Sequence, residues 1–134
     1  MRYHASRILT MTLFLFPFLL LAGCAAQDEA HNLDLTLLAY ERTIRWGQLY
    51  DSHKFQKDPQ PVSQQERERL KQIKITGYDL ITREHTPGKY VQVVDIKYYY
   101  EDQAVIRTIT DTQEWEYVKD KRQWLLLTTL PTFK

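Results

Sequence analysis

The feature that most constrains the fold of this chain is a change in the spacing of its apolar residues at Ile73. From there to Leu130, apolar and polar residues alternate with a period of two, which is typical of strands with one buried face. Short polar segments at 86–89, 102–103 and 119–122 interrupt the alternation and predict tight turns between antiparallel neighbours. The predicted strands cover residues 73–85, 90–101, 104–117 and 123–130.

The predicted turns also fix which residues face each other across the sheet, because a slip by one residue would exchange its two faces. The turn at 102–103 pairs Tyr100 with Val105, Tyr98 with Arg107, Ile96 with Ile109, Val94 with Asp111 and Tyr90 with Trp115. The turn at 119–122 pairs Tyr117 with Trp124, Trp115 with Leu126 and Asp111 with Leu130. Both hairpins predict the same inner face. The first strand fits it only with a bulge near Gly77, since Asp79 otherwise points inward while Tyr78 and Leu80 point outward.

Before the strands, the apolar spacing is helical. Asn32 is predicted to be an N-cap, and apolar residues recur every three or four positions from Leu33 to about Phe55. Gly47 falls inside this predicted helix at a cost of about 1 kcal/mol relative to alanine. A glycine at such a position indicates the close approach of a neighbouring element.

A second, shorter helix is predicted after two prolines within residues 57–61. Ser63 and Glu66 have the spacing of a capping box, which marks a helix start, and the helix is expected to end near Gln72. Most of its residues are charged or polar, so it is expected to expose most of its surface to solvent.

The first 23 residues have the three parts of a secretory signal. Two arginines begin it, an apolar run of 14 residues at 8–21 follows, and small residues at 22–23 precede Cys24, the only cysteine. A membrane-spanning helix needs about 20 apolar residues, whereas the apolar part of a signal has about 7–15. The run therefore predicts a cleaved signal rather than a permanent transmembrane anchor.

The string Leu21-Ala22-Gly23-Cys24 resembles the lipobox of bacterial lipoproteins. The resemblance implies that Cys24 is linked to diacylglycerol by a thioether, is freed by cleavage and is then often N-acylated, for example with palmitate. Each buried methylene contributes about 0.8 kcal/mol, so two or three chains make attachment to the membrane effectively permanent. Because Ala25 and Ala26 rather than aspartate follow, the sorting rules of lipoproteins imply the outer membrane, with the domain facing the periplasm. The alternatives are an ordinary cleaved signal with a free thiol and a short uncleaved anchor.

Cleavage before Cys24 would remove 23 of the 134 residues and leave 111, enough for one modest core. The predicted organisation is a signal peptide at 1–23, a lipidated tether without periodicity at 24–32 and a single domain at 33–134. Loss of the two arginines of the signal lowers the 18 basic residues to 16, against 17 acidic ones. Such a balance argues against nucleic acid as a partner and leaves membrane attachment to the lipid.

A long helix, a short helix and a curved four-stranded antiparallel sheet, in that order, resemble the nuclear-transport-factor-2-like (cystatin-like, cone-shaped) fold. The string Tyr-Glu-Arg-Thr-Ile-Arg-Trp-Gly at 40–47 and a sheet that ends in Trp124 and Leu130-Pro131 are similar to small envelope lipoproteins of Gram-negative bacteria. The resemblance covers residues 33–133 and lies in pattern rather than in a catalytic motif. It implies the α+β class.

Asp111 is the weak candidate for catalysis. Enzymes of the fold that the chain resembles, such as ketosteroid isomerases and scytalone dehydratase, use carboxylates, histidines or tyrosines inside the cone, and burial would raise the pKa of Asp111 as a general base requires. The alternative is a structural aspartate that accepts hydrogen bonds from Arg42, Arg45 or Trp46. A possible pocket would be lined by Trp46, Tyr98, Arg107, Asp111 and Trp115. Stacking of Arg107 on the Tyr98 ring would explain that pair without a function.

Metal and cofactor binding have no support in the sequence. His53 and His85 lack the spacing of zinc ligands, and neither a glycine-rich phosphate loop nor a Gly-x-Ser-x-Gly elbow is present. The predicted function is therefore a lipid-anchored binding or assembly module. The alternative is a carrier of small molecules or a pocket enzyme that uses Asp111.

The outer face of the predicted sheet is the candidate partner surface. It is expected to carry the apolar residues Val91, Val93, Tyr99, Ile106, Leu125 and Leu127 among charged residues and threonines. A monomer rarely exposes an apolar patch beyond a few hundred Å². The pattern predicts either a homodimer or contact with another envelope protein, and the alternative is that it reflects strand propensity alone.

Overall fold

A computed structural model describes the backbone of residues 4–134 and the side chains of residues 23–134. A long helix is followed by a 3-10 helix, a short α-helix and four strands, the last two of which are joined by a 3-10 turn. The elements are α1 (His4–Trp46), η1 (Leu49–Phe55), α2 (Gln64–Lys71), β1 (Ile73–Thr86), β2 (Lys89–Tyr100), β3 (Gln103–Val118), η2 (Lys119–Lys121) and β4 (Gln123–Leu126).

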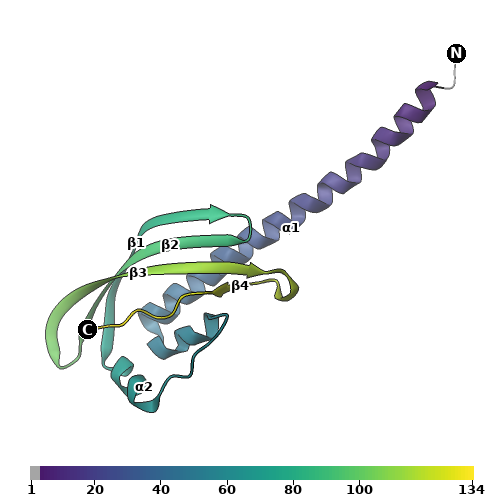
Figure 1. Ribbon diagram of the computed structural model, residues 1–134. Coiled ribbons are helices and arrows are strands. Elements are labelled where there is room, and N and C mark those ends of the chain that lie inside the picture. The colour runs from purple at the N-terminus through teal and green to yellow at the C-terminus, as the bar shows by residue number, and fades with distance from the viewer. Residues whose placement is uncertain (1–3) are drawn as a thin grey trace.

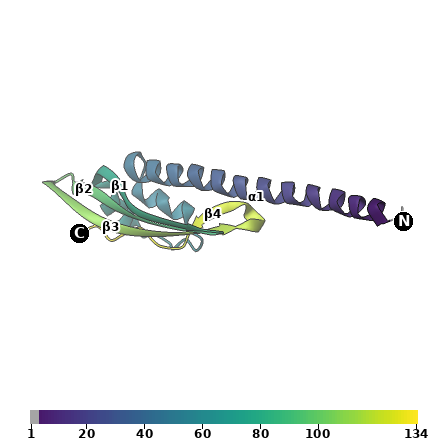
Figure 2. The same ribbon diagram turned by 90° about the horizontal axis from the view of Figure 1, so that it is seen from above.

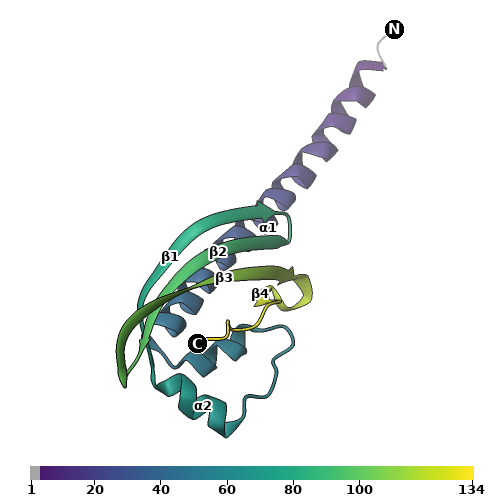
Figure 3. The ribbon, with the colours of Figure 1, turned by 60° about the vertical axis from the view of Figure 1, so that its left-hand side comes forward.

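The four strands form one antiparallel sheet in the order β1-β2-β3-β4, and α1 crosses one face of it (Figure 1, Figure 2). We call the face under α1 the inner face and the opposite one the outer face. The sheet curves and stays open, with α2 at the end far from the N-terminus (Figure 3). This arrangement confirms the predicted α+β class, with its long helix, short helix and four-stranded sheet.

The predicted pairing of the strands is confirmed over most of its length. The confirmed pairs are Tyr98 with Arg107, Ile96 with Ile109, Val94 with Asp111, Tyr90 with Trp115, Tyr117 with Trp124, and Trp115 with Leu126. At the tip of the second hairpin, Tyr100 pairs with Gln103 rather than Val105, because the turn is formed by residues 101–102 and the register shifts after Tyr98. The expected pairing of Asp111 with Leu130 is wrong, since β4 ends before it.

β1 joins the sheet through a register shift between Ile75 and Gly77, where a bulge is predicted. The shift turns Tyr78 toward the inner face and leaves Asp79 outside, so the polar residue no longer enters the core. A second shift, directly after Leu80, is not foreseen by the alternation of the sequence.

α1 ends at Trp46, well before the end predicted near Phe55. A Cβ atom at Gly47 would lie 2.8 Å from the carbonyl oxygen of Thr43, closer than real Cβ atoms come to backbone. The close approach predicted for Gly47 therefore exists, but it is made by the preceding turn of the same helix and not by a neighbouring element. The chain continues as the tighter 3-10 helix η1.

The segment 24–32 is helical although its sequence shows no periodicity, and α1 passes through Asn32, so the helix start predicted there is wrong. Several alanines in this segment favour a helix. Distant residues also hold it: Trp124 Nε1 donates to the carbonyl oxygen of Glu29 at 2.9 Å, and the Gly88 N–H donates to Glu29 Oε1 at 2.9 Å. The spacing of residues within segment 24–32 does not predict these contacts, because their partners lie far away in the sequence.

The core lies between α1 and the inner face. Tyr40 and Ile44 of α1 and Trp115 of β3 are each 1% exposed, and the Tyr40 and Trp115 rings meet edge to face with centroids 5.2 Å apart. Phe133 near the C-terminus is equally buried, with its ring centroid 4.9 Å from that of Tyr98 on β2. Burial of Phe133 draws the last residues away from β3, which explains why β4 is shorter than predicted.

α2 begins where the capping pattern predicts. Ser63 Oγ accepts a hydrogen bond from the Glu66 N–H at 3.1 Å. The Glu66 carboxylate does not complete the capping box, because it binds the guanidinium of Arg69 at 2.6 Å. Arg69 Nη1 also donates to the Tyr100 hydroxyl and to the carbonyl oxygen of Phe133, both at 2.9 Å, and so joins α2 to β2 and the C-terminal segment.

Candidate functional site

Asp111 lies on the inner face of β3, as predicted, and is 5% exposed. Gln113 Nε2 donates to Asp111 Oδ2 at 2.7 Å, and Gln113 Oε1 accepts from the Tyr78 hydroxyl at 3.0 Å and from Gln92 Nε2 at 2.7 Å. The Tyr90 hydroxyl donates in turn to Gln92 Oε1 at 3.1 Å. These five side chains from three strands form one connected network, which we call the buried polar chain.

The sheet register places these side chains together. Gln92 of β2 pairs directly with Gln113 of β3, and Asp111 lies two residues before Gln113, on the same face. Tyr78 of β1 reaches them only because the bulge before it changes the face that it occupies. The buried polar chain is therefore a product of strand pairing.

The charge of Asp111 is poorly compensated. Among the described residues, no basic side chain forms an ion pair with it. Burial raises the pKa of the Asp111 carboxyl, and the hydrogen bond from Gln113 opposes the rise. Burial and then the charge of Asp111 raise the pKa of Tyr40, whose hydroxyl is buried without a hydrogen-bond partner among the described residues. Burial likewise raises the pKa of Tyr78. The surroundings favour the neutral form of all three groups.

The predicted hydrogen bonds from α1 to Asp111 are wrong. Arg45 pairs with Glu41 at 3.1 Å, and its guanidinium lies 4.5 Å from the centre of the Trp46 ring. Trp46 is 70% exposed and Arg42 is exposed as well. Successive helix residues are about 100° apart, so a residue two positions after the inward-facing Tyr40 points to the opposite side.

The structure does not gather the side chains that the sequence places in one pocket. Asp111 and Trp115 share the inner face, and Tyr98, 3% exposed, donates its hydroxyl proton to the carbonyl oxygen of the last residue at 2.8 Å. The Arg107 guanidinium lies 5.7 Å from the centre of the neighbouring Tyr100 ring, so the expected stacking on Tyr98 is wrong. Trp46 lies outside the core.

The buried polar chain lies mostly below the surface, with Asp111 5% and Gln92 6% exposed. We describe five surface hollows, and Asp111 lines none of them. The hollow beside Trp46, of about 430 Å³, lies between the end of α1 and the start of β1 and includes Lys71 and Lys74. Within the described residues, no three His, Cys, Asp or Glu side chains gather in a way that could hold a metal. A general base has to reach its substrate, and none of these five hollows brings solvent to the Asp111 carboxyl.

Sequence reasoning missed Tyr78, Gln92 and Gln113 as members of the network, although part of the signal is there. The two glutamines occupy facing inner positions in strands whose other inner residues are mostly apolar. Because buried amides are nearly always hydrogen-bonded, two such positions predict a side-chain pair. Tyr78 carries no comparable signal, since its face depends on where the bulge falls.

The outer face is the second candidate surface, and α1 does not cover it (Figure 2). Ile106 is 66% and Leu127 46% exposed, while the other four apolar residues predicted to point outward are half-buried. Exposed Thr108, Thr110 and Thr112 follow Ile106 along β3. The apolar surface is thus present but interrupted by hydroxyl groups.

Cys24 is exposed and lies within α1. In the part of the chain that the structure describes, no helix combines the length and the apolar character needed to cross a membrane. Comparisons with protein-family models, with curated proteins and with solved structures give no match for this chain.

Proposed function

We propose that this protein is a lipid-anchored envelope protein whose domain faces the periplasm and acts as a binding or assembly module. The observation that carries the proposal is the single cysteine at position 24, which follows two arginines, a short apolar run and small residues in the order of a lipoprotein signal. Ala25 and Ala26 after the cysteine favour the outer membrane as its destination.

The inner face supports binding or assembly over catalysis. Asp111 is buried, is hydrogen-bonded to Gln113 and lines none of the described hollows. An enzyme or carrier of this fold needs space between the helix and the sheet, and here Tyr40, Trp115 and Phe133 fill that space. An assembly protein works with a filled interior, because its partner binds outside.

The outer face is the surface that we propose for a partner, either a second copy or another envelope protein. The apolar residues Ile106 and Leu127 project from it without cover in the described chain. Rows of threonine between them supply hydroxyl groups that suit a partner surface of mixed polarity.

Substitution of the cysteine tests the anchor. In cells grown with labelled palmitate, the wild-type chain should take up label and lose its first 23 residues, whereas Cys24→Ser should do neither. Ala26→Ser is the matched control, because it makes a comparably small change while keeping the cysteine and the residue after it. Fractionation should place the wild-type protein in the outer membrane. Labelled palmitate in the Cys24→Ser protein, or wild-type protein in the inner membrane, would contradict the corresponding half of the proposal.

A further inference from the structure

The first helical residues after Cys24 are fixed to the sheet by three contacts. Asp28 Oδ2 forms an ion pair with Arg122 Nη2 at 2.9 Å. The next residue, Glu29, accepts hydrogen bonds from the Gly88 N–H and from Trp124 Nε1, both at 2.9 Å. Gly88 belongs to the turn between β1 and β2, whereas Arg122 and Trp124 lie where η2 leads into β4. Two consecutive helix residues thus hold two separate hairpin ends.

The chain between Cys24 and these contacts is short. Five residue steps separate Cys24 from Glu29, which is about 7.5 Å in a helix at 1.5 Å per residue. Even if this segment were fully extended, it would span at most about 18 Å. Lipid on the Cys24 sulfur would therefore keep the two hairpin ends beside the membrane surface, whichever conformation residues 25–27 adopt.

The same end of the molecule offers groups that suit phospholipid headgroups. Lys89, Lys119 and Lys121 are exposed, and none of them forms an ion pair among the described residues. Asp120 is the exposed acidic residue between the last two. Lysine ammonium groups bind phosphate, and each one near an anionic membrane surface contributes about 1 kcal/mol.

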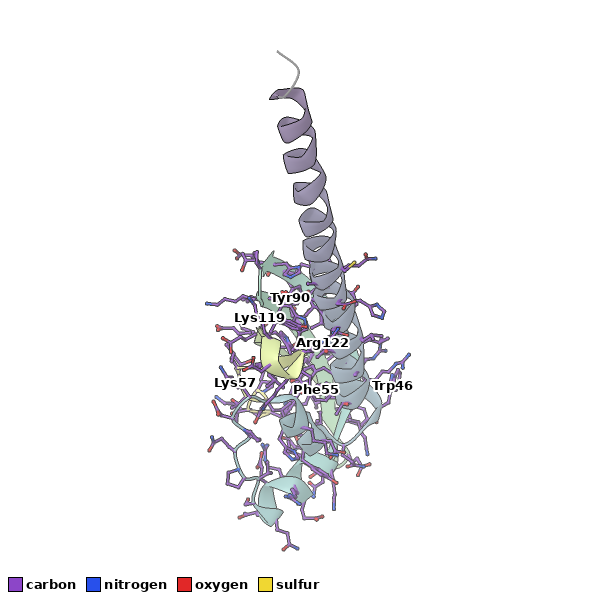
Figure 4. The ribbon with its side chains drawn as sticks, turned by 90° about the vertical axis from the view of Figure 1, so that its right-hand side faces the viewer. Trp46, Phe55, Lys57, Tyr90, Lys119 and Arg122 are labelled. Atoms are coloured by element: carbon purple, nitrogen blue, oxygen red, sulfur yellow. The ribbon has the colours of Figure 1, made fainter. Side chains whose placement is uncertain are left out.

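A hollow of about 450 Å³ lies on this end and begins at the residue after Cys24. Its lining combines Ala25, Ala26 and Tyr117 with the basic residues Lys119 and Arg122 and the acidic residues Asp28 and Glu29. Asp28 is the ion-pair partner of Arg122. Figure 4 shows Lys119 and Arg122 beside the part of α1 that leaves the domain. Lys119 forms no ion pair among the described residues, so it is the group of this lining that suits the phosphate of a lipid.

From these contacts we propose that the protein stands end-on at the membrane, with residues 86–89 and 119–122 against the phospholipid headgroups. We call these two segments the headgroup-facing turns. The proposal rests on the lipidation of Cys24 proposed above. It places α2 and the β2–β3 turn farthest from the membrane, and it leaves the outer face of the sheet roughly perpendicular to the membrane and open to a partner (Figure 1).

A single introduced thiol can measure this orientation in the full, lipidated chain, because lipidation uses the only native cysteine. Lys121→Cys places a thiol in a headgroup-facing turn, Glu68→Cys places one on α2, and Thr112→Cys places one on the outer face; all three positions are exposed. Each variant is labelled with a fluorophore and reconstituted in vesicles of phosphatidylethanolamine and phosphatidylglycerol that carry a quencher on the headgroup. The label at residue 121 should lose most of its fluorescence, and the labels at 68 and 112 should keep theirs.

The possible failures can be told apart. Equal quenching at 121 and 68, or strongest quenching at 112, would overturn the end-on orientation if mass spectrometry shows lipid on Cys24. A wild-type chain whose Cys24 takes up the fluorophore would overturn the lipidation itself, and the orientation with it. Unchanged near-ultraviolet circular dichroism of the labelled variants would exclude misfolding as the cause of either result.

Discussion

The buried polar chain combines two satisfied amides with one poorly satisfied carboxylate. Gln92 and Gln113 each use both ends of the side-chain amide, whereas Asp111 keeps a carboxylate in the core with one hydrogen bond from a side chain. Tyr40, whose hydroxyl is unpaired within the described structure, packs above the same strands. Burial of a charge without a cation costs free energy, so Asp111 lowers the stability of the fold when it is ionised.

This reasoning predicts that Asp111→Asn stabilises the protein at neutral pH. The amide oxygen can still accept from Gln113, while the desolvated charge disappears, so we expect a gain of about 1 kcal/mol, or about 4 °C in Tm. Folding raises the pKa of Asp111, so the folded state takes up its proton at a higher pH than the unfolded state does. The penalty is fully present above the folded-state pKa and disappears as the pH falls toward the unfolded value of about 3.9.

Thermal unfolding of the variant and the wild type between pH 4 and 8 measures the effect, and the advantage of Asp111→Asn should shrink toward acid pH. Asp79→Asn is the matched control: that carboxylate is exposed and pairs with Lys97 at 2.8 Å, so its loss should change Tm little and without the same pH trend. A lower Tm for Asp111→Asn at pH 7 would show that the charge has a stabilising partner after all.

Among the elements, the junction of α1 and η1 depends on one residue. Gly47 N–H still donates to the Thr43 carbonyl oxygen at 3.1 Å, but a Cβ on Gly47 would press against that oxygen at 2.8 Å and against the Thr43 Cα at 3.2 Å. Backbone atoms cannot move aside as a side chain can. The junction sets the direction in which η1 leaves, and with it the packing of Leu49 and Phe55 on the core.

We therefore expect Gly47→Ala to destabilise the protein by about 1–2 kcal/mol, as overpacking of a rigid site does. Urea unfolding followed by circular dichroism gives the free energy of unfolding directly. Gly77→Ala is a fitting control, because the atoms nearest to its Cβ would belong to the side chain of Lys97, at 3.1 Å and beyond, and not to the backbone, so a smaller loss is expected. Equal losses for the two variants would mean that the clash with Thr43 is relieved by a small shift of the helix end.

At the scale of the whole molecule, the two faces of the sheet differ. α1 covers the inner face, whereas the outer face carries exposed Ile106 and Leu127 among polar residues. If a second copy binds there, a buried interface forms around these two side chains. Introduction of a charge should then separate the copies without disturbing the core.

We predict that residues 25–134 form a dimer in sedimentation experiments at tens of micromolar, and that Leu127→Glu shifts them to monomer because a charge enters the interface. Leu35→Glu serves as control, since Leu35 is 52% exposed on α1 and lies away from the outer face. A monomeric wild type whose sedimentation is unchanged by Leu127→Glu would exclude a homodimer through this face and leave another envelope protein as the partner.

Local pattern in the sequence was sufficient for most of the pairing of β2, β3 and β4, for the bulge near Gly77 and for the N-cap at Ser63. Each of these features depends on residues within one hairpin or one helical turn. At that range, the alternation of apolar and polar residues and the capping pattern are sufficient to predict structure. The inward position of Asp111 follows from the same alternation. The expected hydrogen bond from Arg42, Arg45 or Trp46 does not follow from it, because that expectation required knowledge of the rotation of α1 about its axis.

Only the tertiary structure decided where the elements stop and what the buried groups touch. The helix through residues 24–32 is held by Gly88 and Trp124, which are 59 and 95 positions away from Glu29 in the chain. β4 is shortened because Phe133 is buried against Tyr98. Such contacts stabilise the fold by joining segments that are remote in sequence. The local spacing of apolar residues therefore does not predict them, and the ends of each element are set only when the whole chain packs.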